Sequence, residues 1–404
     1  MTNASEILIV GGGLAGSSLA LALAQAGRDV VLIDALPQTT RKKPAFDGRS
    51  SALALASVRL LQAIGIWSAL DGKTQPILEI KVTDGRAGEG AAPCFLHFDH
   101  AEIEDGPMGH MCENRYLRQA LLEALKAEAL ITQITDTVIA QDVSGTQVTL
   151  TLGSGKKLSG ALVVGSDGRA SGTAQRAGIK RTGWSYGQTA LVAAVEHSEP
   201  HHGVAHQFFM PPGPLAILPL PGNLSSIVWS EADETAKSFE ALSDQDFIEV
   251  LRPRFGDFLG DIKLRGERFS YPLGLSIANH FVADRLALIG DAAHGIHPIA
   301  GQGLNAGLRD VGALTQVISD AVKRGEDFAA SDVLARYQQW RRFDTTALAV
   351  TTDLTNHLFS NDNGFLRAIR NIGMGTINAI PALRRGMIRE AAGLTGDLPD
   401  LMKG

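Results

Sequence analysis

Cysteine, aromatic residues and excess positive charge are all scarce in this 404-residue sequence. Its two cysteines, Cys94 and Cys112, are too few for a disulfide framework, so we expect free thiols in a reducing cytoplasm. Aromatic residues make up 6% and the formal net charge is −6. This argues against nucleic-acid binding, because phosphate contacts need clustered cations and single strands need stacking platforms.

Long apolar runs and metal-ligand clusters are also missing from the sequence. No segment reaches the roughly 18 apolar residues of a membrane span, and Met1 to Glu6 lacks the basic start of a signal peptide. His201 and His202 follow Pro200 in a polar stretch, which indicates a loop more than a metal site. We therefore expect no metal and no membrane-spanning segment.

What remains is the composition of a folded protein with a large core. Hydrophobic residues make up 45% and charged residues 20%, which excludes wholesale disorder. At the start of the chain, residues 7–10 predict a strand, residues 17–26 a helix and residues 29–33 a second strand that ends at Asp34. A βαβ unit of this kind predicts a parallel sheet.

Glycines between the first strand and the helix fit the pattern G-x-G-x-x-G. Gly11 permits a tight turn, Gly13 lets a pyrophosphate touch the backbone, and Gly16 lets helix and strand pack closely. The helix N-terminus offers free N–H groups to phosphate, and the acid after the second strand can accept from ribose hydroxyls. The alternative is a glycine-rich turn without a ligand. The residues expected to contact a dinucleotide are Gly11, Gly13, Leu14, Ala15, Gly16 and Asp34.

A second glycine segment distinguishes FAD from NAD. Residues 286–290 predict a strand that runs into Gly290-Asp291, and a helix is predicted from residue 302. An NAD site has no use for such a segment, whereas the longer FAD needs a second docking point. Asp291 can accept from a ribityl hydroxyl, and amides at the helix N-terminus can stabilise negative charge on the flavin; a structural Asp that caps a turn is the alternative. The residues expected at this end of the cofactor are Gly290, Asp291, Gly301, Gly303, Leu304 and Asn305.

The middle of the chain changes to a period of two. A hairpin is predicted where residues 147–152 and 157–164 flank a Gly-Ser-Gly turn, and residues 204–210, 215–220 and 224–230 predict further antiparallel strands. Helical spacing appears in residues 51–66, 115–129 and 302–323 and after residue 331.

The sequence thus predicts an α/β fold with a Rossmann-like FAD-binding domain, a substrate domain built on an antiparallel sheet, and a helical C-terminal region. The FAD-binding domain is expected to be discontinuous, over residues 1–75, 101–180 and 272–330. The substrate domain is expected over residues 76–100 and 181–271, and the helical region over residues 331–404.

Three segments carry a family resemblance. Together with the N-terminal glycine pattern, VVGSDGRAS at residues 163–171 and IGDAAHGIHPIAGQGLN at residues 289–305 resemble the class A flavin monooxygenases, of which para-hydroxybenzoate hydroxylase is the type member. The chain is most similar to the ubiquinone-biosynthesis flavin hydroxylases. Further matches are Arg49–Leu53, Glu113–Arg115, Asp362–Asn363, Pro381, Ala391–Leu394 and Leu398–Pro399. One departure is Asp34, where many members carry Glu.

The resemblance implies a reaction and several residue roles. NAD(P)H, bound transiently, reduces the flavin; O2 adds at flavin C4a, and the hydroperoxide hydroxylates an aromatic ring. Arg49 is implied near the flavin phosphate or ribityl chain and Arg115 near the pyrophosphate, with a surface ion pair as the alternative for each. His294 and Pro298 are implied near the reactive flavin face, although a loop-stabilising hydrogen bond is the simpler role for His294.

Substrate contacts are expected on the strands that roof the flavin. The candidates are Phe208, Pro219 and Trp229, with a place in the core as the alternative for each. The resemblance implies a polyprenyl-phenol precursor of ubiquinone as substrate. Hydroxylation of a soluble aromatic acid or secondary metabolite, and a non-catalytic flavoprotein subunit of a biosynthetic complex, are the alternatives.

The C-terminal region raises the question of a membrane surface. Residues 367–389 contain five arginines and no acid, with apolar residues interleaved. Such a tail can lie on an anionic bilayer, which would suit a polyprenylated substrate and place the protein peripherally on the inner face of the membrane. Alternatively these helices pack on the flavin domain.

Overall fold

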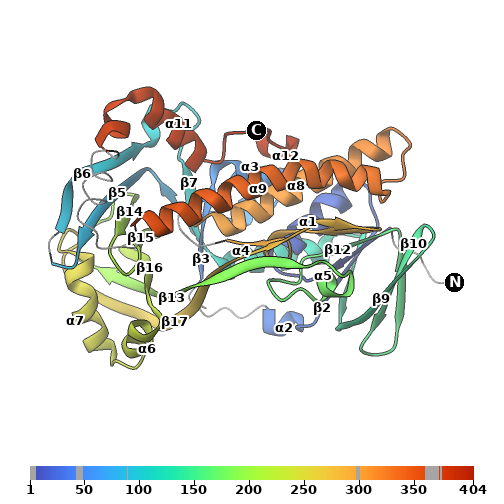
Figure 1. Cartoon of the computed structure of the whole chain (residues 1–404), viewed down its shortest axis with the longest axis horizontal. Helices are drawn as coiled ribbons and strands as arrows, with labels where there is room; N and C mark the ends of the chain where they lie inside the picture. Colours follow the sequence, from blue (N-terminus) through green and yellow to red (C-terminus); the bar gives the residue numbers. More distant parts are fainter. Residues whose placement is uncertain (1–5, 42–48, 89, 297–300, 360–372, 374) are drawn as a thin grey trace.

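The computed structural model describes residues 6–41, 49–88, 90–296, 301–359, 373 and 375–404 (Figure 1). Pro298 and the arginines at 367 and 370 lie outside this range, so the expectations for them stay predictions. None of the helices in the described part of the chain is both long and apolar enough to cross a bilayer. The same residues contain no group of three His, Cys, Asp or Glu side chains that could hold a metal ion.

A six-stranded, mainly parallel sheet forms the first layer. Its strand order is β18 (Val282–Ala283), β19 (Leu286–Leu288), β12 (Leu162–Gly165), β1 (Ile7–Val10), β2 (Val30–Asp34) and β8 (Ile131–Thr135). Neighbours pair in parallel except β18 with β19. The sheet is rich in Val, Ile and Leu because both of its faces are buried. Its helices include α1 (Leu14–Gln25), α3 (Leu55–Ala63), α4 (Asn114–Ala127) and α8 (Gln302–Lys323).

An eight-stranded sheet forms the second layer. Its order is β20 (His294–Gly295), β17 (Ile262–Ala278), β13 (Arg181–His197), β16 (Leu224–Ala232), β15 (Leu215–Leu220), β14 (Val204–Phe209), β5 (Glu79–Arg86) and β6 (Gly90–Asp99). Its pairs are antiparallel except β14 with β5. The α/β fold class expected from the sequence, with a mainly parallel sheet, a mainly antiparallel sheet and a helical C-terminal region, is therefore confirmed.

Smaller elements complete the fold. Two three-stranded sheets have the orders β11 (Lys157–Gly160), β10 (Gln147–Leu152), β9 (Val138–Ser144) and β3 (Ser50–Ala54), β7 (Gly109–Glu113), β4 (Thr74–Ile77). The short helices are α2 (Gln38–Arg41), α5 (Gly172–Arg176) and α12 (Asp400–Lys403), and the 3-10 turns are η1 (Trp67–Leu70), η2 (His100–Glu102) and η3 (Gly290–Ala292). Helix α9 (Ser331–Phe359) runs beside α8 toward the eight-stranded sheet, and α11 (Pro381–Ala391) lies over that sheet's β6 edge (Figure 1).

Two expected elements are corrected by the structure. The helix expected over residues 51–66 begins only at Leu55, because residues 50–54 form β3 and pair with β7. The strand expected over residues 157–164 is broken at Ala161. Its first half completes the hairpin with β10, whereas its second half enters the parallel sheet beside β1.

Helices α6 (Asp233–Glu240) and α7 (Asp244–Phe255) cover one face of the eight-stranded sheet. Trp229 is fully buried in the core between them, with its ring 5.0 Å from Phe239 and 5.9 Å from Phe247. Its indole N–H donates to Glu231 at 3.0 Å, so that the buried ring has its polar atom satisfied.

Replacing Trp229 by alanine tests this core. We expect Trp229→Ala to lower the free energy of unfolding by about 3–5 kcal/mol, because it leaves a cavity in a packed layer. The matched control is Trp184→Ala, whose side chain is 47% exposed and should cost under about 1 kcal/mol. Chemical denaturation followed by fluorescence measures both, and equal losses for the two variants would contradict the packing described.

Candidate functional site

The turn after β1 is shaped by glycine. Gly11 has a φ of +105°, and a Cβ built there would lie 2.3 Å from the carbonyl oxygen of Ser166. A Cβ at Gly16 would lie 2.0 Å from the carbonyl oxygen of Gly11, so helix and strand approach too closely for any side chain. At Gly13, by contrast, no described atom lies within 4 Å of such a Cβ, and among the described residues no side chain caps α1 there. A phosphate group fits this open, uncapped N-terminus.

The acid at the end of β2 holds the same turn. One carboxylate oxygen of Asp34 accepts the Gly12 N–H at 2.6 Å, and the other accepts the Leu36 N–H at 2.7 Å. A carboxylate oxygen can accept more than one hydrogen bond, so these two bonds do not by themselves exclude a ribose contact. The expected ribose contact stays a prediction, and the structure adds a role in shaping the turn.

The second glycine segment packs directly against the first. Gly290 has a φ of +57°, and a Cβ there would lie 3.4 Å from the Cβ of Ala15 in the first turn of α1. A Cβ at Gly307 of α8 would lie 3.3 Å from the Cα of Gly290. The start of α1, the loop after β19 and the first turns of α8 therefore converge. Helix α8 begins after Gly301 without a side-chain cap among the described residues, and the space around Gly303 is open.

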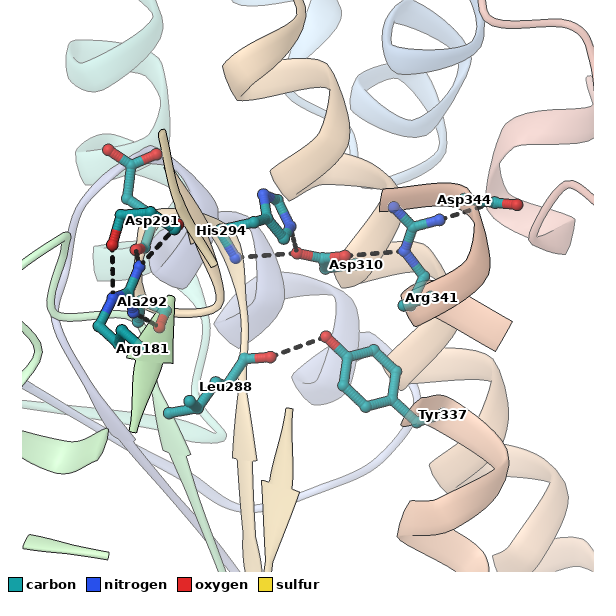
Figure 2. Close-up of polar contacts among 11 residues, drawn as sticks. Arg181, Leu288, Asp291, Ala292, His294, Asp310, Tyr337, Arg341 and Asp344 are labelled. Carbon is teal, nitrogen blue, oxygen red and sulfur yellow. Dashed lines mark hydrogen bonds and ion pairs between the residues drawn. The ribbon is translucent and has the colours of Figure 1, made fainter. Parts of the chain in front are cut away.

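Two side chains, the partly exposed Arg181 and the buried Asp310, fix the loop after β19 from two sides (Figure 2). On one side the Arg181 guanidinium donates to the carbonyls of Asp291, at 3.1 Å, and of Ala292. On the other side Asp310 accepts the Gly290 N–H at 2.9 Å. The Asp291 carboxylate is half-exposed, and Arg169 lies 3.4 Å from it. The side chain expected to reach the ribityl chain therefore points away from the core.

Asn305 has partners of its own within the chain. Its side-chain oxygen accepts from the Ala54 N–H at 3.0 Å and from the Ser57 hydroxyl at 2.8 Å, and its nitrogen donates to the Ala52 carbonyl at 2.8 Å. The side chain thus ties α8 to β3 and α3. The expected contact of its backbone amide with the cofactor stays a prediction.

The two arginines implied by the resemblance differ in their surroundings. Arg115 pairs with Glu113 at 2.8 Å and lies over the Tyr116 ring at 4.6 Å, and this ion pair is largely buried, unlike the surface pair that was the alternative for it. Arg49 is exposed and lies over the Tyr271 ring at 4.9 Å, with its Nε donating to the phenol oxygen at 3.2 Å. Arg49 thus joins the β3 region to the eight-stranded sheet. The flavin contacts of both residues stay predictions.

The His294 side chain faces the protein interior and not the solvent. It is buried, and its Nε2 lies 2.6 Å from the carboxylate of Asp310. This is the loop-stabilising hydrogen bond that was the simpler of its two expected roles. Asp310 was not singled out from the sequence, because a lone acid inside a helical pattern gives no signal until its partners are known.

The substrate residues expected from the sequence need correction. Trp229 belongs to the core under α6 and α7, and Phe208 packs against the same cluster and against the Phe258 ring at 6.2 Å. Strand alternation puts Pro219 on the face of Ile217, which belongs to that core as well. All three residues therefore lie on the face that the helices cover. The other face carries the cluster of Tyr186, Ala190, Val192, Val228, Tyr271 and Leu273.

Comparisons with known proteins identify the family of this chain. A family model described as an FAD binding domain matches residues 4–351. Ubiquinone hydroxylase UbiL of Rhodospirillum rubrum is 45% identical to this chain, over 99% of this chain and 93% of its own length. The 3-demethoxyubiquinol 3-hydroxylase of Escherichia coli is 35% identical, over 98% of this chain and 100% of its own.

A solved structure shares the fold. The p-nitrophenol 4-monooxygenase PnpA of Pseudomonas putida superposes with a TM-score of 0.77 at 20% identity, over 98% of this chain and 99% of its own. The matched family model, the names of the relatives and the two converging glycine segments all indicate an FAD-binding protein. This chain belongs to the FAD binding domain family and is an FAD-dependent monooxygenase of the group that includes the ubiquinone hydroxylases.

Proposed function

We propose that this protein hydroxylates the aromatic ring of a polyprenylated precursor of ubiquinone, with NAD(P)H and O2 as co-substrates. The observation that carries the proposal is the close approach of Gly290 to Ala15, which brings two distant glycine segments together into one cradle. The names of the two relatives with 45% and 35% identity support the substrate class.

The cradle assigns a part to each segment. The N-terminus of α1 would hold the pyrophosphate at Gly13, and Asp34 would accept from the ribose. Asp291 would accept from the ribityl chain, and the amides at the start of α8 would face the flavin ring. Bound there, FAD supplies the redox and oxygen-activating chemistry, while the protein orients the ring to be hydroxylated and excludes water.

The substrate ring would lie against the face of the eight-stranded sheet that is opposite α6 and α7. Tyr271 of this face touches Arg49, which precedes β3, and β3 in turn approaches Gly301 at the start of α8. This chain of contacts supports a substrate position beside the predicted flavin site. Its Val192 and Val228 are apolar, which suits an aromatic ring and leaves little room for water.

A glycine pair tests the cradle. Gly13→Ala keeps an accessible backbone conformation and open space for its methyl group, so we expect the apoprotein to fold normally while its Kd for FAD rises at least about tenfold. Gly16→Ala should instead destabilise the apoprotein, because its methyl group meets a backbone carbonyl. Thermal melts of both apoproteins and FAD titrations measure the contrast. Tight FAD binding by Gly13→Ala would show that the pyrophosphate does not bind at this turn.

Substrate class is tested with matched phenols. We expect a prenylated phenol to stimulate NAD(P)H oxidation and to yield a product with one oxygen atom from labelled O2, whereas the same phenol without its prenyl chain should be a poor substrate. Mass spectrometry and spectrophotometry measure the two quantities. Equal activity with both phenols would favour a soluble aromatic substrate. Oxidation that no aromatic compound stimulates would favour a non-catalytic subunit.

We also infer that α11 docks peripherally on a membrane surface. One side of the helix packs into the protein through the buried Ile388, whereas Ile380, Leu383 and Met387 are between 39% and 51% exposed on the side that they share. Arg384 pairs with Glu102 at 2.7 Å and Arg389 with Asp105 at 3.4 Å, so two of the tail arginines serve the protein itself. The exposed apolar stripe, and not these two charges, carries the inference.

The stripe is tested with vesicles of anionic phospholipid. We expect Leu383→Glu with Met387→Glu to reduce co-sedimentation several-fold, because the change removes apolar contact area and adds repulsion. The control is Ile139→Glu, an exposed position on β9 at the opposite end of the molecule (Figure 1). Co-sedimentation unchanged by the double substitution would rule out docking through α11.

A further inference from the structure

A buried charge network lies behind the loop that carries Asp291, and the proposed function makes no use of it (Figure 2). Asp310 of α8 is fully buried, and its two carboxylate oxygens accept three hydrogen bonds. One oxygen accepts from Gly290 N–H at 2.9 Å and lies 2.6 Å from His294 Nε2; the other accepts from Arg341 Nε at 2.7 Å. Arg341 comes from α9 and is also buried.

The network holds the carboxylate of Asp310 in the protein core, where desolvation disfavours a charged group. Burial raises the pKa of Asp310, but His294 and Arg341 beside it outweigh that effect and leave the pKa below its ordinary value. Asp310 is therefore an anion in the core. Buried ion pairs contribute little net stability compared with apolar residues of the same volume, because desolvation offsets their attraction. Their geometry, in contrast, is strict, and here it fixes one backbone N–H of the loop.

That N–H belongs to the residue on which the two glycine segments meet. Gly290 packs between Ala15 of α1 and Gly307 of α8. Tyr337 of α9 also donates to the Leu288 carbonyl, at 2.8 Å, but this hydrogen bond holds strand β19 and does not reach the loop itself. On the opposite side of the loop, Arg181 holds the carbonyls of Asp291 and Ala292. The loop is thereby clamped through its amide on one side and through its carbonyls on the other.

We propose that Asp310 and Arg341 are positioning residues for the cofactor, which act by holding Gly290 against Ala15 so that Asp291 and the N-terminus of α8 face the same FAD molecule as α1. The proposal rests on the FAD contacts put forward above. Neither side chain touches the cofactor. Their effect passes through the Gly290 N–H and through the placement of α8, on which Asp310 itself lies.

Three variants separate positioning from stability. Asp310→Asn keeps the size of the side chain but turns an amide donor toward a pocket of three donors. Arg341→Lys keeps the positive charge but loses the fixed geometry of the guanidinium. Tyr337→Phe is the control, because it removes a buried hydrogen bond to β19 from the same helix without touching the charges.

The readouts are the Kd for FAD, the midpoint potential of the bound flavin and the melting temperature of each apoprotein. We expect Asp310→Asn to raise the Kd at least tenfold and to make the potential more negative, because the helix N-terminus that favours negative charge on the reduced flavin moves away. Arg341→Lys should show a smaller change in the same direction. Tyr337→Phe should change the Kd less than twofold, whatever it does to the melting temperature.

Two results would overturn the proposal. One is a Kd and a potential in Asp310→Asn that match the wild type. The other is a Kd that follows the melting temperature equally in all three variants, since that is the signature of stability alone. If Asp310→Asn does not fold, Arg341→Lys against Tyr337→Phe decides by the same criteria. Wild-type protein that binds FAD but hydroxylates no prenylated phenol contradicts the substrate proposal and leaves this one standing.

Discussion

The structure depends on one close approach between backbones that are far apart in the chain. A Cβ built at Gly290 would touch Ala15 at 3.4 Å, and one built at Gly307 would lie 3.3 Å from the Cα of Gly290, so these backbones are closely packed. The approach is possible because β1 and β19 are parallel strands of one sheet with only β12 between them, so their carboxyl ends lie at the same edge. A long cofactor needs contacts at both of its ends. In the proposed site, two loops that a single sheet holds side by side would supply these contacts.

The sequence predicted best those elements whose signals are local. The helix expected over residues 302–323 has those bounds in the structure, because a glycine before it and a regular apolar period define it without reference to other parts of the chain. The strand over residues 7–10 is equally local. Residues 50–54 follow a helical spacing and yet form β3, since their pairing with β7 overrides the local preference. No pattern within the segment itself could reveal that partner.

The candidate site shows the same division. Its glycines could be found because a turn, a helix N-terminus and a close approach each leave a trace in the sequence. The face on which Trp229 lies could not be found, since alternation along a strand assigns residues to two faces without saying which one the helices cover. Asp310 and Arg341 were missed for a related reason. Each is a common residue inside an ordinary helix, and their meaning arises only when α8 and α9 pack together.

The loop after β19 connects the two sheets mechanically. Arg181, which grips its carbonyls, is the first residue of β13, and that strand continues through the middle of the eight-stranded sheet. The next strand pairing, between β17 and β20, brings His294 itself into the eight-stranded sheet while its side chain contacts Asp310 of the flavin-side helix. Any shift of that sheet relative to α8 would therefore strain hydrogen bonds at the loop before it disturbed either core. Because packed cores resist gradual deformation, the proposed substrate face and the proposed cofactor loop would keep one fixed relation, which ring hydroxylation requires of a reacting carbon and the flavin beside it.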